Sequence, residues 1–577
     1  MTIRKTKAAM DWKSIALERQ IHRSKTIDAV KPVVPDVPKD LPSNVTGIPG
    51  KLLPQDVIAI TETAPEVLLQ QLASKELTCT AVTKAFLQRA GLASKLTNCV
   101  TELLPQRALA RAQYLDDYLY NHGKPIGPLH GLPISVKEHI GMKGLDQNGG
   151  FISWVGRIAP DDALILKLLW NAGAVFYART TEPQTLMHLE TSNNIYGVTV
   201  NPYNSKLTSG GSSGGEGALL GMKASPLGMG TDIGGSIRVP AANNGVFGLR
   251  PTSYRLPLHG IVATMVGEEL IIPVVGPLGQ SLSSINLFMK AIIDQRPWLY
   301  DPSLVPIPWK DTSKDTLLRR GPDGRRKLRI GLLPDDNIVK PHPPILRGLK
   351  TLVDKIKDHP DIEIIEFPPY KHDEGWRIIS TLYFADGAVE EYEAIDSSGE
   401  PWRPLSNWII KENPNVKMYT LDQSWKLVQE REGYKAAYAS HWNSVGTGLS
   451  GSELDAGQVQ DKMVDVILCP AGAGAASPLD CTRYWSYTSQ WNLLDYPAIT
   501  FPTGLAVGPE DEVEKDYKPR NEQDAYNHSL YNPETYADAP ISLQLVGRRY
   551  EDEKVLEALG MILEIAGLPK TSQASKP

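Results

Sequence analysis

Two glycine-rich segments constrain this chain more than any other feature of its sequence. Residues 208–216 read Thr-Ser-Gly-Gly-Ser-Ser-Gly-Gly-Glu, and residues 230–238 read Gly-Thr-Asp-Ile-Gly-Gly-Ser-Ile-Arg. Runs of this composition are usually flexible linkers, although glycine also permits the backbone angles that tight turns need. The aliphatic residues 218–222 follow the first segment at once, which favours a tight turn and a packed helix over a free linker.

A lysine at the end of a short apolar run is the second feature. Residues 131–138 read Gly-Leu-Pro-Ile-Ser-Val-Lys-Glu, and 132–136 is predicted to be a buried strand that leads to Lys137. Side chains alternate along a strand, so Ser135 shares the face of Lys137 and Glu138 points away. Burial lowers a lysine pKa from about 10.4, which makes Lys137 a candidate general base. A lone lysine is more often a solvated surface charge, and only the serine segments favour the catalytic interpretation.

The two glycine-rich segments supply serines for that base. A serine hydroxyl is a poor nucleophile until a base takes its proton, so we interpret Ser236 as the nucleophile and Ser212 as a relay to Lys137. The first segment lacks the Gly-Lys-Ser/Thr ending of a phosphate-binding loop, and Ser236 does not sit in a Gly-x-Ser-x-Gly elbow. The sequence therefore does not favour a phosphate-binding loop.

The turn before the second serine supplies candidate donors for an oxyanion. Its backbone N–H groups, those of Ile233, Gly234, Gly235 and Ser236, would converge on the oxygen of a tetrahedral intermediate. Side chains at the two glycines would block that approach. Losing one such donor typically lowers the rate by about 10²–10³.

These segments, in this order and spacing, resemble the amidase signature family, whose members use a Ser-Ser-Lys triad. The likeness runs almost without interruption through residues 208–252 and continues at 272–277, 491–504 and 541–548. It covers most of the chain from about Thr61 onward. Within the family, the chain is most similar to fungal acetamidase-type amidases.

The resemblance implies a fold, a site and a reaction. The fold would be α/β, a single large α/β/α domain around a mixed β-sheet. The site would contain Lys137, Ser212 and Ser236, a cis Gly211–Ser212 peptide bond, and Leu186 bordering the leaving group or the acyl chain. The reaction would hydrolyse a carboxamide to a carboxylic acid plus ammonia or an amine, through an acyl-enzyme and without a cofactor.

The histidines give no sign of a metal site. The eleven histidines include no His-x-x-x-His or His-Glu-x-x-His pair, so we expect no metal. We place His139 near the lysine strand and His188 on the substrate side. Either would become the next candidate base if Lys137 were not the base.

Composition limits the partners and the location. The formal net charge is −6 and the pI is about 6.1, so the chain lacks the excess of basic residues that is typical of nucleic-acid-binding proteins. Four cysteines without a Cys-x-x-Cys pair favour a reduced, cytoplasmic protein. The chain start lacks an apolar secretory region, and the longest uncharged stretch, about 271–289, contains two prolines. We expect a small-molecule amide as partner, no nucleic acid and no membrane span, and we allow for a homodimer.

The chain is predicted to form one large domain with an N-terminal arm. Residues 1–55 would form the arm, with a charged helix to about Ser24 and then a proline-rich connector. Residues 56–570 would form the domain, with an acidic surface insertion at about 509–539. Residues 571–577 would be a C-terminal tail.

Helix and strand patterns alternate after the arm. Strands at 132–136 and 174–178 flank a helix at 162–172, which favours a sheet covered on both faces. Thr63 and Glu66 have the spacing of a capping box at a helix start.

Two alternatives to a serine amidase stay open at this point. An amidotransferase-type subunit of the same family would need partner subunits and glutamine, and no basic patch for tRNA is visible. A non-catalytic binding protein on an amidase fold would have lost one of Lys137, Ser212 or Ser236, and all three are present. The leading hypothesis is a serine amidase whose amide substrate the sequence does not name.

Overall fold

A mixed sheet forms the centre of the computed structural model, which describes residues 11–313, 317–320, 326–449 and 456–572. The strands are β1 (Val100–Leu103), β2 (Pro133–Lys137), β3 (Val175–Thr180), β4 (Ser192–Asn193), β5 (Gly197–Val198), β6 (Leu227–Asp232), β7 (Phe247–Arg250), β8 (Val274–Gly279), β9 (Arg319–Arg320), β10 (Arg326–Leu332), β11 (Ile362–Glu366), β12 (Val466–Pro470), β13 (Ala498–Ala506) and β14 (Pro540–Val546). Twelve of them form one sheet in the order β1-β3-β2-β6-β8-β7-β13-β14-β12-β10-β11, with β9 beside β10. Strands β4 and β5 pair separately.

The large sheet contains parallel and antiparallel pairs. Strand β2 is parallel to β3 and β6, and β10 is parallel to β11 and β12. The pairs that run from β6 through β8, β7, β13 and β14 to β12 are antiparallel. The parallel pairs require crossover connections, which the chain makes with helices.

The central strands bury both of their faces. In β14, Leu545 joins one apolar core and its neighbour Val546 joins the other. In β12, Leu468 joins the same core as Leu545, and Ile467 joins the same core as Val546. Adjacent residues of a strand point to opposite faces, so the sheet needs helices on both sides.

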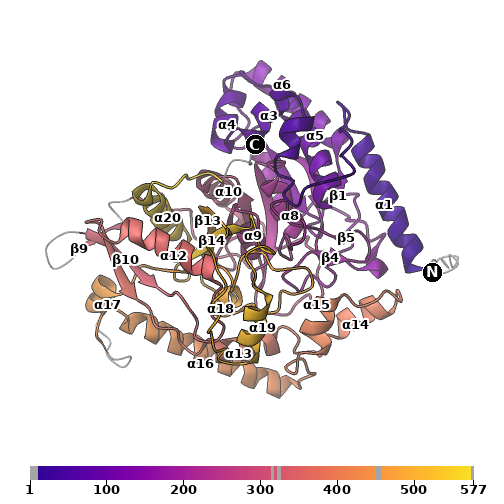
Figure 1. Cartoon of the computed structure of the whole chain (residues 1–577). Helices are drawn as coiled ribbons and strands as arrows, with labels where there is room; N and C mark the ends of the chain where they lie inside the picture. Colours follow the sequence, from indigo (N-terminus) through magenta and orange to yellow (C-terminus); the bar gives the residue numbers. More distant parts are fainter. Residues whose placement is uncertain (1–10, 314–316, 321–325, 450–455, 573–577) are drawn as a thin grey trace.

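Helices cover both faces of the sheet (Figure 1). The helices are α1 (Trp12–Asp28), α2 (Ile48–Leu52), α3 (Gln55–Glu62), α4 (Pro65–Ala73), α5 (Cys79–Thr97), α6 (Pro105–His122), α7 (Leu164–Asn171), α8 (Gly214–Gly221), α9 (Arg238–Asn243), α10 (Leu282–Ile293), α12 (Pro343–Ile356), α13 (His372–Leu382), α14 (Val389–Asp396), α15 (Pro404–Ser406), α16 (Leu421–Ser444), α17 (Ala456–Lys462), α18 (Ser486–Leu494), α19 (Glu522–Leu530) and α20 (Asp552–Ala566). One core contains side chains of α5, α7, α8, α10, α12 and α20, and the other contains those of α13, α16 and α18. No helix in the described ranges is long and apolar enough to cross a membrane.

This layered arrangement confirms the predicted fold class. Strands β2 and β3 and helix α7 lie close to their predicted bounds, because continuous apolar runs and a one-sided helical stripe are strong local signals. The predicted capping box is wrong. Thr63 Oγ1 instead donates to Ala59 O (2.7 Å) at the end of α3, and Glu66 accepts from Ser281 Oγ (2.8 Å). Helix α4 begins at Pro65 without a side-chain cap.

The described part of the predicted arm lies against the rest of the molecule. Helix α1 runs along one edge in Figure 1, and residues 1–10 lie outside the described residues. Gln20 Nε2 donates to Ile195 O (2.7 Å), and His22 Nε2 lies 2.9 Å from Glu102 Oε2. The arm is therefore attached by polar contacts to the loop after β4 and to β1. In the predicted tail, residues 573–577 also lie outside the described residues.

The predicted insertion at 509–539 is anchored by apolar contacts. It contains α19, and its Tyr531 and Tyr536 are buried in a core shared with Ile345 of α12 and with Leu207. The weak periodicity of this segment concealed these contacts, because isolated tyrosines in a polar stretch carry no pattern.

Candidate active site

Lys137 ends β2 within the sheet, between β3 and β6. Its side chain is fully buried. The Nζ atom lies 2.6 Å from Ser212 Oγ and 3.0 Å from Thr231 Oγ1. The structure therefore brings the lysine and the first of the two serines together, and it adds a threonine that sequence analysis missed.

Burial controls the protonation of Lys137. Desolvation lowers its pKa to about 8, although the carboxyl groups of Glu182, Asp232 and Glu216 oppose that shift. Glu216 is itself buried and accepts a hydrogen bond from Ser135 Oγ (2.5 Å). Burial raises the pKa of Glu216 to about 8, so this carboxyl group is mostly protonated near neutral pH and does little to keep the lysine charged.

Glu138 points away from the lysine, as alternation along a strand predicted. Its carboxylate accepts hydrogen bonds from the backbone and side-chain N–H groups of Asn148 (2.8 Å each) and from Gly149 N–H (3.1 Å). It also lies 3.7 Å from Arg179 Nη2. These partners hold the carboxylate apart from Lys137, which makes no ion pair within the described chain.

Ser212 lies in the turn that leads into α8. The Gly211–Ser212 peptide bond is cis, as the resemblance implied. No side chain fits at Gly211, because a Cβ atom there would lie 2.4 Å from the backbone N and O of Glu190. Ser213 N–H donates to Ser236 O (3.0 Å), and this bond joins the two glycine-rich turns.

A buried ion pair clamps the turn that carries Ser236. Arg238 donates from Nε and Nη2 to the two carboxylate oxygens of Asp232, at 3.0 Å each. Asp232 also accepts from the N–H groups of Gly235 (2.8 Å) and Ile237 (3.1 Å). Burial alone would raise the pKa of Asp232, but Arg238 and these hydrogen bonds lower it to about 2. The clamp therefore stays ionised at neutral pH.

Three backbone donors of the turn have no partner in the described part of the chain. Among the described residues, the N–H groups of Ile233, Gly234 and Ser236 have no hydrogen-bond acceptor. Gly235 differs from the expectation, since its N–H group already donates to Asp232. Three of the four N–H groups predicted as oxyanion donors thus lack another acceptor among the described residues, and the fourth is bound to Asp232.

Two residues from distant helices orient this turn, and sequence analysis missed both. Tyr383 Oη, just after α13, donates to Ile233 O (2.7 Å), and Thr488 Oγ1 of α18 donates to Gly234 O (2.7 Å). In a planar trans peptide the C=O and the next N–H point in opposite directions, so binding Ile233 O orients Gly234 N–H. The two donors are 150 and 254 positions from their acceptors, and no local pattern marks them.

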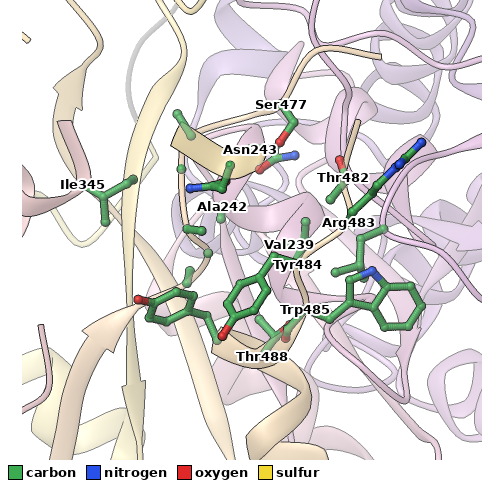
Figure 2. A pocket seen from close by; sticks show the side chains of 18 of the residues that line it. Val239, Ala242, Asn243, Ile345, Ser477, Thr482, Arg483, Tyr484, Trp485 and Thr488 are labelled. Atoms are coloured by element: carbon green, nitrogen blue, oxygen red, sulfur yellow. The ribbon is translucent and has the colours of Figure 1, made fainter. Parts of the chain in front are cut away.

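A pocket lies next to this turn: its lining residues Val239, Trp485 and Thr488 pack against Gly234 and Gly235, although residues 233–236 do not line it themselves (Figure 2). Val239 and Asn243 of α9 line one side, residues 482–485 line the opposite side, and Thr488 closes one end. The lining mixes small apolar side chains with hydroxyl, amide and guanidinium groups. Helix α9 begins at Arg238, two residues after Ser236, and its Val239, Ala242 and Asn243 line the pocket, while Ser236 itself does not.

The remaining candidate residues surround the site at different positions. Leu186 is buried in the loop after β3 with a φ of +61°, and Leu189 of the same loop lines the pocket. His188 is buried, and its two ring nitrogens have no partner among the described residues. His139 Nε2 lies 3.0 Å from Thr231 Oγ1. Within the described ranges, no cluster of three or more His, Cys, Asp or Glu side chains is arranged to hold a metal.

Comparison with known proteins decides the family. A family model described as Amidase matches residues 81–556. This chain belongs to the amidase signature family. The acetamidase of Emericella nidulans is 39% identical over 558 residues, which cover 96% of this chain and 98% of that protein. The acetamidase of Aspergillus oryzae is 37% identical over 558 residues, which cover 96% of this chain and 99% of that protein.

A solved structure supports the same assignment. Fatty acid amide hydrolase is 35% identical and superposes with a TM-score of 0.88, covering 97% of this chain and 96% of that chain. The predicted family, its likeness to fungal acetamidases and the amidase interpretation are confirmed. The protein is a hydrolase that acts on amide C–N bonds.

Gly235→Ala should destabilise the protein and lower its amidase activity. The φ of Gly235 is +131°, and a Cβ atom there would lie 2.3 Å from Thr488 Oγ1. Such a backbone angle costs a side chain about 1–3 kcal/mol, which should lower the melting temperature. Gly433→Ala, in the interior of α16 with nothing within 4 Å of its new Cβ, is the control. It should leave the activity unchanged and should not lower the melting temperature, since alanine is favoured over glycine inside a helix by about 0.5–1 kcal/mol. A Gly235→Ala protein with the wild-type melting temperature would contradict this account of the turn.

Proposed function

We propose that the protein hydrolyses carboxamides through an acyl-enzyme on Ser236, with Ser212 as proton relay and Lys137 as base. The observation that carries this proposal is the buried Lys137 Nζ, 2.6 Å from Ser212 Oγ, in a turn bound to the backbone of Ser236. A lysine with a pKa lowered to about 8 is partly neutral near pH 7 and can accept a proton.

The proton transfers follow from this order of groups. Ser236 Oγ attacks the carbonyl carbon while its proton passes to Ser212 Oγ and the Ser212 proton passes to Lys137 Nζ. The tetrahedral intermediate then expels the amine, which takes a proton back along the same route. Water attacks the acyl-enzyme through the same relay and releases the carboxylic acid. Lys137 is neutral again after each half of the reaction.

The oxyanion is proposed to bind at the turn before Ser236. The N–H groups of Ile233, Gly234 and Ser236 are the donors that support this assignment, since each lacks another acceptor in the described structure. Gly235 would join them only after releasing Asp232. Fixed donors in a buried site need no reorganisation as charge develops on the substrate oxygen.

Labelling with a fluorophosphonate tests the nucleophile. The reagent should form one adduct, in a peptide within residues 230–250, and Ser236→Ala should abolish it. Ser529→Ala, an exposed serine of α19, is the matched control and should label normally. An adduct elsewhere in an active preparation, or none, would refute the assignment of Ser236.

The pH dependence of kcat/KM tests the base. Lys137 accepts a proton only as the neutral amine, so kcat/KM should rise with pH through about 8 and fall as the ammonium form takes over below it. Lys137→Ala should lower kcat/KM by about 10²–10⁴, the usual contribution of a general base. Its residual rate should rise with pH because hydroxide replaces the missing base. A folded Lys137→Ala protein with a near wild-type rate at neutral pH would exclude lysine from the mechanism.

We propose that the pocket along α9 holds part of the amide substrate and that Leu186 borders it. The polar groups of Asn243 and Arg483 beside Val239 support short or polar amides over long unbranched acyl chains.

A series of amides from acetamide through aryl amides to long acyl amides tests this proposal. Short and polar members should have the highest kcat/KM. Leu186→Trp should change the relative rates across the series, while Leu299→Trp, at an exposed position, should not. An equal effect of Leu186→Trp on every amide would remove Leu186 from the substrate site.

The setting of the enzyme is also part of the proposal. A cytoplasmic location is supported by the four cysteines, none of which is paired. A small-molecule amide as the partner, without nucleic acid, agrees with the net charge of −6. A homodimer is the oligomer to test first by size-exclusion chromatography. We retain the division into an arm at 1–55, a domain at 56–570 and a tail at 571–577 as a proposal.

A further inference from the structure

His139 and Thr231 form a chain of contacts behind Lys137 that the proposed relay does not use. His139 Nδ1 lies 2.7 Å from Val262 O, and His139 Nε2 lies 3.0 Å from Thr231 Oγ1. Thr231 Oγ1 lies in turn 3.0 Å from Lys137 Nζ. All three side chains are buried, so water does not compete for these contacts.

The partners of His139 determine where its hydrogen lies. A carbonyl oxygen only accepts, so Nδ1 carries the hydrogen that binds Val262 O. Burial, and after it the nearby Lys137, lower the pKa of His139 to about 3, so the ring stays neutral near pH 7. In this neutral ring Nε2 has no hydrogen and accepts from the Thr231 hydroxyl. The single hydroxyl hydrogen of Thr231 therefore points to His139, and its oxygen accepts from Lys137.

The direction of that hydrogen matters because a neutral lysine amine has one lone pair. A Thr231 hydroxyl that donated to Nζ would occupy the lone pair and leave none to take the Ser212 proton. With its hydrogen on His139, Thr231 instead accepts an N–H of Lys137. The lone pair then stays directed at Ser212.

We propose that His139 is a positioning residue that holds the hydroxyl hydrogen of Thr231 and so keeps the lone pair of Lys137 available to Ser212. This inference rests on the proposed role of Lys137 as base. The charged and titratable groups around the three residues come from β1, β3, β6, α8, the residue after β2 and the loop after β3. They are Glu102, Glu138, Arg179, Glu182, Glu216 and Asp232. None of them is altered in the variants below, so a changed profile reports on the His139–Thr231 pair.

A pair of substitutions separates this role from simple support of the fold. His139→Leu should lower kcat/KM by about tenfold or more, because the freed Thr231 hydrogen then competes for the lone pair of the base. Adding Thr231→Val removes that hydroxyl at nearly constant shape, and it should raise kcat/KM of the His139→Leu protein by about threefold or more. If His139→Leu lowered kcat/KM only through a packing defect, adding Thr231→Val would lower kcat/KM further.

The pH profile gives an independent readout. In His139→Leu, kcat/KM should be lower than in the wild type at every pH. Alkaline pH should not restore it, because the lone pair of Lys137 is then occupied by the Thr231 hydrogen and not by a proton that a base can remove. His139→Gln places a carbonyl acceptor near the position of Nε2 and should lose less activity than His139→Leu. Full recovery of His139→Leu at alkaline pH would overturn the inference.

His372→Leu is the matched control, because His372 is a buried histidine of α13 whose ring nitrogens have no partner among the described residues. Adding Thr231→Val to it should bring no increase in rate.

If His139→Leu does not fold, His139→Met takes its place in the same comparison. A double variant no faster than the His139 single variant overturns the inference. Lys137→Ala, measured alongside, distinguishes a failure of this inference from a failure of the proposed function. Wild-type rates in Lys137→Ala would overturn the proposed function itself.

Discussion

The burial of one lysine amine without a compensating carboxylate is the condition on which the site depends. Desolvation favours the neutral amine of Lys137 and lowers its pKa to about 8. The neighbouring carboxyl groups do not cancel this effect, because Asp232 is paired with Arg238, and burial raises the pKa values of Glu182 and Glu216. The layered fold maintains the condition, since β2 lies inside a sheet that helices cover on both faces.

The Asp232–Arg238 clamp connects the site to the second half of the chain. Besides Asp232, the Arg238 guanidinium donates to Thr488 O (3.0 Å), to Gln544 Oε1 (2.9 Å) and to Asn492 Oδ1 (2.6 Å). One fully buried arginine thus fixes the turn before Ser236, helix α18 and strand β14 relative to one another. Breaking a buried pair of this kind leaves an uncompensated charge and typically costs about 3–5 kcal/mol.

Features set by local chemistry were predictable from the sequence. The apolar run before Lys137 predicted a buried strand, and the aliphatic residues 218–222 predicted the packed helix that the structure shows as α8. The glycine at position 211 is required because a side chain would meet the Glu190 backbone. Local reasoning failed at Thr63, whose hydroxyl binds the preceding helix instead of capping the next. It did not reveal the burial of Tyr531 and Tyr536 within 509–539, because single tyrosines in a polar stretch carry no pattern.

The sequence by itself determined which groups can react, because a lysine in an apolar run and serines in glycine-rich turns are properties of neighbouring residues. Only the tertiary structure decided how those groups are tuned. The lowered pKa of Lys137, the orientation of the Gly234 N–H by Tyr383 and the hydrogen of Thr231 held by His139 all depend on partners from other strands and helices. Desolvation and hydrogen-bond direction are set by the groups that surround an atom in space, and a linear sequence does not contain that arrangement explicitly.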